Sequence, residues 1–399
     1  MKPTASLAFC IILSLSAHPR ASAPRPAPPP ARPAQEAARE FRAVADGVEH
    51  LRQTRGAGDE RWAVNVLRLD LTRVDIAVAR AFDAGVGVET TSSLAARHAA
   101  LAAVNGGYFR TAAGVYRGEP QGILAHAGRL LSEPQRGRAA LGVWRTTART
   151  ELRFGYVEFR GSVRSQSGRE HAVGGVNRPR AADELVVYTP EFHRTTLTGP
   201  GGVEAIVRRG RVAQVRADLG SSLIPADGFV LSGAGRADEW LRQNLARGSR
   251  VRINLDLLDA GGGGGGRRAW ASAAHVIGGG PQLVKEGRVD ITGEREGFDA
   301  RGFVNARHPR TAAGRDRAGR VLLVTVDGRQ PGVSVGMTLD ELARLLVEFG
   351  AVEAINLDGG GSTTMVVRGE VVNKPSDREG ERPVSDAILV LPRGRAGAR

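Results

Sequence analysis

The segment that most constrains the fold runs from Ala354 to Met365, where short apolar residues lead into Asn356-Leu357-Asp358, three glycines and a Ser-Thr-Thr run. Asn356 and Asp358 are two residues apart, so both polar side chains leave the same face of an extended strand. Glycine permits positive φ and lets backbone N–H groups turn inward, so this loop can closely approach an anion or a sugar. The alternative is a plain turn between two strands.

A second apolar segment, residues 101–104, ends in a similar way, in Asn105-Gly106-Gly107-Tyr108-Phe109. Asn-Gly is a strong hairpin signal, so a simple turn is one interpretation. The other is a binding loop, in which Tyr108 or Phe109 offers an aromatic surface on which a sugar ring can stack.

Further polar groups follow apolar segments in the second half of the chain. Residues 320–326 predict a buried strand that delivers Asp327-Gly328-Arg329, and His308-Pro309-Arg310-Thr311 precedes that strand. Thr338 and Glu341 form a capping-box pattern, which predicts the start of an amphipathic helix.

Predicted strands far outnumber predicted helices. Residues 62–80 alternate between apolar and polar side chains, which predicts a hairpin, and residues 92–100 favour a helix. We therefore expect the α+β class: a single large domain with a mixed, mostly antiparallel β-sheet and a few packed helices.

The chain divides into four expected parts. Residues 1–23 resemble a secretory signal peptide, with Lys2, an apolar run and a small-residue end, which predicts a secreted or periplasmic bacterial protein. Residues 24–58 form a Pro/Ala-rich linker with a short helix. Residues 59–392 form the functional domain, with 161–270 as a β-rich elaboration, and 393–399 form a disordered tail.

Composition narrows the classes of partner. The net charge is +14 over 399 residues, and nearly all of the cations are arginines. A nucleic-acid binder can carry such a charge, but these arginines are scattered and form no basic helix or finger. We expect anionic substrates, no nucleic-acid partner and no stable membrane span. Cys10 is the only cysteine and lies in the predicted leader, so no disulfide is expected in the mature chain.

Taken together and in order, the polar segments resemble the phosphodiester glycosidase family. The resemblance rests on Asn105-Gly106-Gly107-Tyr108-Phe109, Gly278-Gly279-Gly280-Pro281-Gln282-Leu283, His308-Pro309-Arg310-Thr311-Ala312, Asp327-Gly328-Arg329, Gly336-Met337-Thr338-Leu339, the 356–364 loop, Asn373 and Glu381-Arg382-Pro383-Val384-Ser385-Asp386. It implies hydrolysis of a sugar-1-phosphodiester at the anomeric carbon, and the bacterial relatives are associated with exopolysaccharide. The cysteine-rich modules of the animal enzyme have no counterpart here, so a lysosomal substrate is not expected.

Such a reaction passes through an oxocarbenium-like state, so it needs carboxylates beside the anomeric carbon and positive charge around the departing phosphate. We predict Asp358 as the nucleophile or base and Asp327 as its partner. His308, Arg310 and Arg382 are expected to hold the phosphate together with the amides of residues 359–362, and His308 also counts as a catalytic candidate. The remaining candidates contact the sugar and the loop: Asn105, Gly107, Tyr108, Phe109, Thr311, Asn356, Gly359, Gly360, Ser362, Thr363 and Asn373.

Each of these residues also has a purely structural interpretation. Asp327-Gly328 is a common turn, His308 before proline can simply shape a loop, and Asn373 is a good turn residue. Arg382 can pair with Glu381 at the surface, and Thr363 can pack a strand. Glu119 and Asp386 are weaker carboxylate candidates, and either can be the true acid.

No cofactor is expected. Asp, Asn and carbonyl groups suit a divalent cation, but no ligand spacing names a site. Two other functions stay open at this point, a phosphodiesterase that cleaves the P–O bond and a non-catalytic protein that binds cell-surface glycan.

Overall fold

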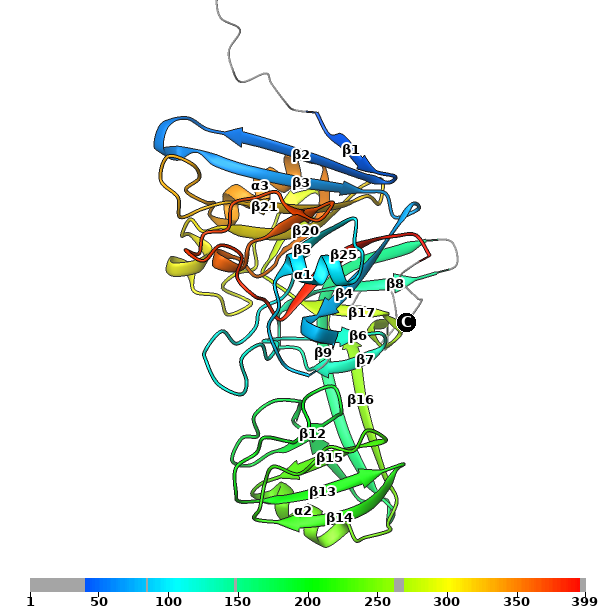
Figure 1. The fold of residues 1–399 in the computed structure, drawn as a ribbon. Helices are drawn as coiled ribbons and strands as arrows, with labels where there is room; N and C mark the ends of the chain where they lie inside the picture. Colours follow the sequence, from blue (N-terminus) through cyan, green and yellow to red (C-terminus); the bar gives the residue numbers. More distant parts are fainter. Residues whose placement is uncertain (1–39, 84, 147–148, 262–268, 395–399) are drawn as a thin grey trace, which may run out of the picture. The chain divides into compact units, whose positions relative to one another are not determined.

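The structure is a computed structural model, and it describes residues 40–83, 85–146, 149–261 and 269–394. The expected leader, the first part of the expected linker and residues 395–399 of the expected tail lie outside these ranges. Strands hold 44% of the described residues and helices 12%, so the expected α+β class is wrong and the fold is β-rich (Figure 1). The reason is that most apolar positions alternate with period two, and few segments repeat with the helical period.

The described residues form four sheets, and the first has eight strands. In spatial order they are β1 (Arg42–Ala45), β2 (Val48–Arg55), β3 (Trp62–Leu69), β21 (Val321–Val326), β20 (Arg310–Asp316), β22 (Ala351–Asn356), β18 (Gln282–Lys285) and β19 (Arg288–Val289). The short helix expected within the linker is wrong where the structure describes it, since β1 and β2 form a hairpin there. The predicted 62–80 hairpin is also wrong, because β3 pairs with β2 and β21.

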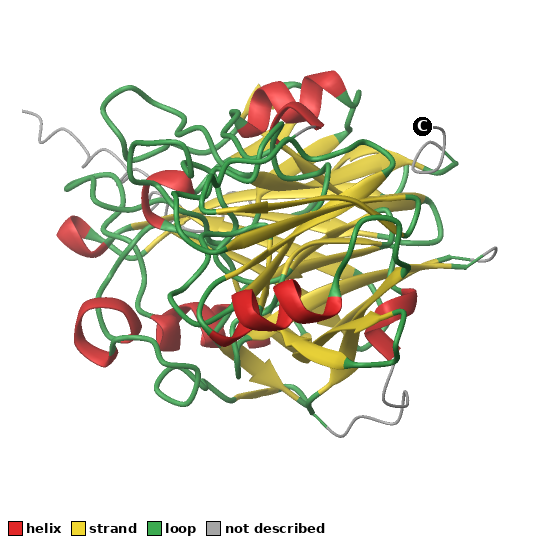
Figure 2. Ribbon diagram, turned by 90° about the horizontal axis from the view of Figure 1, so that it is seen from below, coloured by secondary structure: helices red, strands yellow, loops and turns green. Residues whose placement is uncertain are grey.

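One face of the first sheet is covered by α3 (Leu339–Glu348). Its capping box is present as predicted. The Thr338 side chain accepts from the Glu341 N–H, and the Glu341 carboxylate accepts from the Thr338 N–H. Leu339, Leu342 and Leu346 are buried where α3 packs on β18 and β22, in a cluster that also contains residues of β3 and β21. The helix thus seals the sheet on one side, and the helices lie outside the strands (Figure 2).

A second sheet has five strands and shares a hydrophobic core with the first sheet. Its strands are β24 (Glu370–Val371), β23 (Met365–Val367), β5 (Ala102–Asn105), β25 (Asp386–Pro392) and β4 (Val74–Arg80). Helix α1 (Thr91–Arg97) packs its Leu94 and Ala95 into this sheet, close to the predicted position. Apolar residues of both sheets share one buried cluster.

The two remaining sheets lie in the middle of the sequence. One contains β10 (Glu170–Val173), β9 (Thr150–Ser165), β8 (Ala139–Arg145), β17 (His275–Gly278), β6 (Leu124–His126) and β7 (Arg129–Ser132), with β16 (Val251–Asp259) paired to β9. The other contains β11 (Gly175–Val176), β12 (Leu185–Tyr188), β15 (Gly228–Gly233), β13 (Val203–Arg208) and β14 (Arg211–Ala217), and α2 (Arg236–Asn244) packs on it. The long pair β9 and β16 reaches this last sheet (Figure 1).

Within the described ranges, no helix has the length and apolar character needed to cross a membrane.

Candidate active site

Strand ends from two sheets meet around the Gly106 peptide and place two carboxylates beside it. The Asp358 N–H, just after β22, donates to the Gly106 carbonyl at 3.1 Å. The Gly106 N–H donates to the Asp386 carbonyl at 3.0 Å, and the Gly107 N–H donates to the Asp386 carboxylate at 2.8 Å. Asp386 is the first residue of β25. The next residue, Ala387, pairs with Asn105 at the end of β5. Asp358 and Asp386 therefore flank one turn.

Glycine is required at this turn by close approach. A Cβ on Gly106 would overlap the Asp386 carboxylate and lie 2.6 Å from Ile277. A Cβ on Gly107 would lie 2.7 Å from the Gly278 carbonyl. The two glycines of the predicted Asn-Gly-Gly loop thus leave room for the buried carboxylate of Asp386.

The electrostatics of Asp358 and Asp386 set this pair apart from ordinary surface acids. Burial raises the pKa of Asp358 to about 6, although the Gly359 amide, the Ser362 hydroxyl and the charge of Arg382 all favour its ionised form. Burial also raises the pKa of Asp386 to about 7, and the charge of Asp358 raises it further. Two carboxyls that influence each other titrate as a pair, so this pair holds about one proton between these two pKa values.

Arg310 supplies a buried cation close to this pair. Its side chain is 1% exposed and donates to the carbonyls of Met337 (2.9 Å), Phe303 (2.6 Å) and Ala306 (2.8 Å). Among the described residues it makes no ion pair with a carboxylate. Burial lowers its pKa to about 10. Three carbonyl groups compensate this buried charge, and with no carboxylate beside it Arg310 adds positive potential to its surroundings.

Arg329 adds a second cation, which the sequence analysis did not single out. Its φ is +59°, and its guanidinium lies against Gly360, where a Cβ would come within 3.1 Å of Nη2. The same Nη2 lies 3.3 Å from His308 Nδ1. Because left-handed backbone is uncommon for arginine, the sequence carried no signal that Arg329 would turn toward the glycine loop.

His308, predicted as a catalytic residue, has both ring nitrogens engaged within the protein. Its Nε2 lies 2.8 Å from the Gly302 carbonyl and its Nδ1 faces Arg329. Burial lowers its pKa, so the ring is neutral at pH 7. A neutral ring that donates through Nε2 can accept from Arg329 through Nδ1 and so orient that cation.

Asp327, predicted as the partner of Asp358, is bonded by groups of the loop that contains Asn373. Its carboxylate accepts from Asn373 Nδ2 at 2.9 Å and from the Lys374 N–H at 3.0 Å. Burial raises its pKa above the ordinary value, although Asn373 and the charges of Arg52 and Lys374 favour the ionised form. The structure thus brings Asp386, one of the two weaker candidates, next to Asp358, while Asp327 ties two loops together.

The predicted sugar-binding amides are used inside the protein. Asn105 donates to the Asp358 carbonyl at 2.7 Å and accepts from Thr311 Oγ1 at 2.7 Å. Asn373 donates to the Thr363 carbonyl and accepts from the Met365 N–H. These side chains hold the loops in place, and their buried amides are already paired.

The glycine loop after Asp358 offers fewer free amides than expected. The Gly359 N–H donates to the Asp358 carboxylate, the Gly360 N–H to the Pro309 carbonyl and the Ser362 N–H to the Gly359 carbonyl. The predicted amide cradle for phosphate is therefore largely occupied by the protein itself, and the arginines become the main candidates for anion binding.

Arg382 lies beside this loop, and it does not pair with Glu381. It donates to both carboxylate oxygens of Asp377, at 2.7 and 3.0 Å, and packs against Gly361. Glu381 accepts from Ser92 at the start of α1 instead. A hollow of about 440 Å³ opens beside Arg382, Glu381 and Phe109. A hollow of about 620 Å³ lies at the opposite end of β20, around Arg315 and Arg320, away from these acids.

Tyr108 and Phe109 point in different directions because neighbouring residues alternate. Phe109 is buried in the core with α1. Tyr108 donates to the Gly280 carbonyl at 2.7 Å and accepts from Asn356 Nδ2 at 2.7 Å. Its ring contacts two aromatic residues that the sequence analysis did not single out, Phe298 and Phe303. Tyr108 is thus the aromatic residue of this turn that lies at the site.

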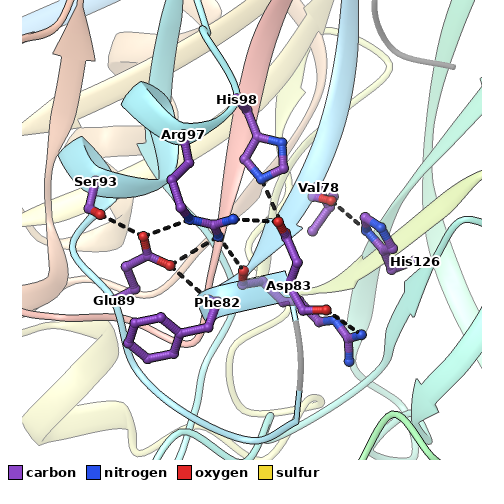
Figure 3. Close-up of polar contacts among 9 residues, drawn as sticks. Val78, Phe82, Asp83, Glu89, Ser93, Arg97, His98 and His126 are labelled. Carbon is purple, nitrogen blue, oxygen red and sulfur yellow. Dashed lines mark hydrogen bonds and ion pairs between the residues drawn. The ribbon is translucent and has the colours of Figure 1, made fainter. Parts of the chain in front are cut away.

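Glu119 lies apart from the acid pair, in an ion pair with Arg110 at 2.8 Å. A further charged cluster surrounds α1, where Arg97 joins Glu89 and Asp83, and His98 contacts Asp83 (Figure 3). Since these charges are matched, the cluster anchors the helix. In the described ranges, no three or more His, Cys, Asp or Glu residues gather in a way that could hold a metal ion.

This chain is similar to known glycosidases over part of its length. A family model described as phosphodiester glycosidase matches residues 201–391, which include Arg310, Asp358 and Asp386. N-acetylglucosamine-1-phosphodiester alpha-N-acetylglucosaminidase from Bos taurus is 47% identical over 75 residues, which are 19% of this chain. That match covers only 14% of the bovine protein.

Two solved structures share the fold. A protein of Burkholderia pseudomallei K96243 described as exported has a TM-score of 0.74 and 30% identity, over 83% of this chain and 74% of the other. A protein from Synechocystis has a TM-score of 0.73 and 22% identity, over 87% of this chain and 62% of the other. This likeness concerns the fold alone. From the family match, residues 201–391 of this chain belong to the phosphodiester glycosidase family.

Proposed function

We propose that this protein is a hydrolase that cleaves the anomeric C–O bond of sugar-1-phosphodiesters. The observation that carries the proposal is the placement of Asp358 and Asp386 around the Gly106 turn, next to a glycine loop against which the guanidinium of Arg329 lies. A phosphodiester carries a permanent negative charge, so it matches such a cation. The acids then face the carbon at which positive charge develops.

The proposed chemistry assigns separate tasks to these groups. Asp358 either attacks the anomeric carbon or takes a proton from the attacking water, and the C–O bond to phosphate breaks. If Asp358 attacks, a glycosyl ester forms on its carboxylate, and water then cleaves that ester to release the sugar. The phosphate leaves with the bonding electrons as a monoester anion, which Arg310 and Arg329 stabilise. Asp386 keeps a proton near neutral pH and thereby limits charge repulsion with Asp358. The products are a free sugar and a phosphate monoester.

The proposed substrates are surface polysaccharides or glycoconjugates outside the cytoplasm, with an N-acetylglucosamine-like sugar. The leader pattern of residues 1–23 and the exported relative support this location. The activity that the name of the bovine relative describes supports the sugar, although the match covers a small part of that protein.

The test is incubation with UDP-N-acetylglucosamine and a panel of glycosyl-1-phosphodiesters, followed by measurement of free sugar. We expect Asp358→Asn to lower turnover by roughly a hundredfold or more. Asp340→Asn, at the exposed start of α3, is the matched control and should match wild type. Glycan binding without turnover, equal in wild type and Asp358→Asn, would instead identify a non-catalytic binding protein.

A further inference from the structure

Four side chains form a stack beside the acid pair. The rings of Phe298 and Phe303 are parallel within 17°, with centroids 4.9 Å apart. The guanidinium carbon of Arg138 lies 4.0 Å from the Phe298 centroid, and that of Arg310 lies 4.8 Å from the Phe303 centroid. The Tyr108 ring is inclined to both, and its centroid lies 5.8 Å from that of Phe298 and 6.4 Å from that of Phe303. The stack therefore has a cation at each end.

The backbone builds this stack through a short π-helical turn, Ala300–Val304. In such a turn the N–H bonds to the carbonyl five residues earlier, as Val304 does to Asp299 and Asn305 to Ala300. Residues five apart therefore lie one above the other, which aligns Phe298 with Phe303. The Asp299 carboxylate caps the turn by accepting from the Arg301 and Gly302 N–H groups. The spacing of the rings is thus set by backbone bonds.

Arg138 resembles Arg310 in its charge balance. It is half-buried, its Nε lies 3.3 Å from the Glu296 carbonyl, and among the described residues it forms no ion pair with a carboxylate. Many other arginines of this chain do form such pairs. In the described ranges Arg138 donates only through Nε, so its Nη groups can make a planar bidentate contact with an anion, whereas Nε and Nη2 of the buried Arg310 are already bonded to carbonyls. The Arg138 end of the stack can therefore receive an anion, and Arg310 adds positive charge at the other end.

We propose that the substrate carries two anionic groups, the scissile phosphodiester at the acid pair and a second phosphate, on the departing side, at Arg138. This inference rests on the proposed function and adds the class of substrate, a multiply charged glycosyl phosphodiester such as a fragment of a phosphate-bearing polymer. The Phe298 and Phe303 edges lie between the two anions and contact the intervening atoms of the substrate.

The experiment compares two probes that differ in one group, N-acetylglucosamine-1-phosphoglycerol and the same compound with a terminal phosphate on the glycerol. We expect wild type to have a kcat/KM roughly tenfold higher for the second probe, mainly through KM. Arg138→Gln should remove most of this ratio, and Arg138→Lys should keep part of it. Arg136→Gln, exposed and two residues away, is the matched control and should keep the whole ratio.

The two hypotheses fail in distinguishable ways. If wild type hydrolyses both probes equally, and Arg138→Gln leaves the ratio of their kcat/KM values unchanged, the two-anion proposal is wrong and the proposed function stands. If wild type releases sugar from neither probe, the proposed function is wrong and the inference falls with it. Thermal unfolding of Arg138→Gln within a few degrees of wild type shows that a lost ratio reflects the contact and not the fold.

Discussion

Asp358 and Asp386 show how two identical side chains acquire different tasks from their surroundings. Asp358 follows a strand at the glycine loop and is partly exposed, with a hydroxyl, an amide and Arg382 nearby. Asp386 is 2% exposed beneath Gly106 and Gly107, with the Gly107 N–H and Ser385 near its carboxylate. The first has access to a substrate, and the second holds a proton.

The pH dependence of kcat/KM should report the ionisation of Asp358. Because the pKa of this base is raised to about 6, kcat/KM should rise with pH through about 6 and level off above it. The measurement is a pH profile with a glycosyl-1-phosphodiester from pH 4 to 9. A rise centred near pH 4, where an ordinary aspartate titrates, would contradict the buried environment of Asp358.

Stability should depend on pH through Asp386. The folded state holds its proton up to about pH 7, whereas an unfolded aspartate releases it near pH 4. The folded state therefore loses stability from this group as pH rises between these values. The asparagine of Asp386→Asn does not titrate and can still accept from the Gly107 N–H. The free energy of unfolding of the variant minus that of wild type should therefore increase by on the order of 3 kcal/mol as pH rises from about 4 to about 7.

Urea unfolding of both proteins at several pH values from 4 to 8 measures this gain. A difference between the two proteins that stays constant with pH would show that Asp386 titrates normally in the folded state.

At the scale of elements, the site depends on loops that approach one another too closely for side chains. Gly106→Ala should cost about 1–3 kcal/mol, because its Cβ would overlap the Asp386 carboxylate. Gly199→Ala is the matched control, since a Cβ there meets nothing within 4 Å, and it should change stability by less than about 0.5 kcal/mol. Chemical unfolding measures both. Equal effects would mean that the turn can relax.

Asp327→Asn tests whether this acid joins loops or takes part in the reaction. An asparagine cannot accept from both Asn373 and Lys374 in the same way, so we expect a loss of about 1–3 kcal/mol of stability. The pH profile of the remaining activity should not move. Full stability combined with lost activity would return Asp327 to the role that the sequence suggested.

Local signals predicted several elements, and long-range partners were out of reach. The capping box of Thr338 and Glu341 marks α3 correctly, and residues 320–326 are the strand β21. In contrast, alternation in residues 62–80 showed two strands but not that each pairs in a different sheet. The proximity of Asp386 to Asp358 follows from the pairing of β25 with β5, which no local pattern encodes. The fold class was wrong because helices were overestimated.

At the scale of the whole molecule, the site lies where segments far apart in the sequence converge. The turn after β5, the loop after β22 and the start of β25 surround the acids, and residues 298–310 add the aromatic and cationic groups. The net charge of +14 adds a long-range attraction for anionic glycans, which accelerates their encounter with the protein. Local cations then select the phosphate, and the acids act on the neighbouring carbon.

The position of bond cleavage tests this account most directly. Hydrolysis of a glycosyl-1-phosphodiester in water enriched in oxygen-18 should place the label in the released sugar, because the account requires attack at the anomeric carbon. Mass spectrometry of both products measures its position. Label in the phosphate monoester would show P–O cleavage and contradict the assignment of Asp358 to the anomeric carbon.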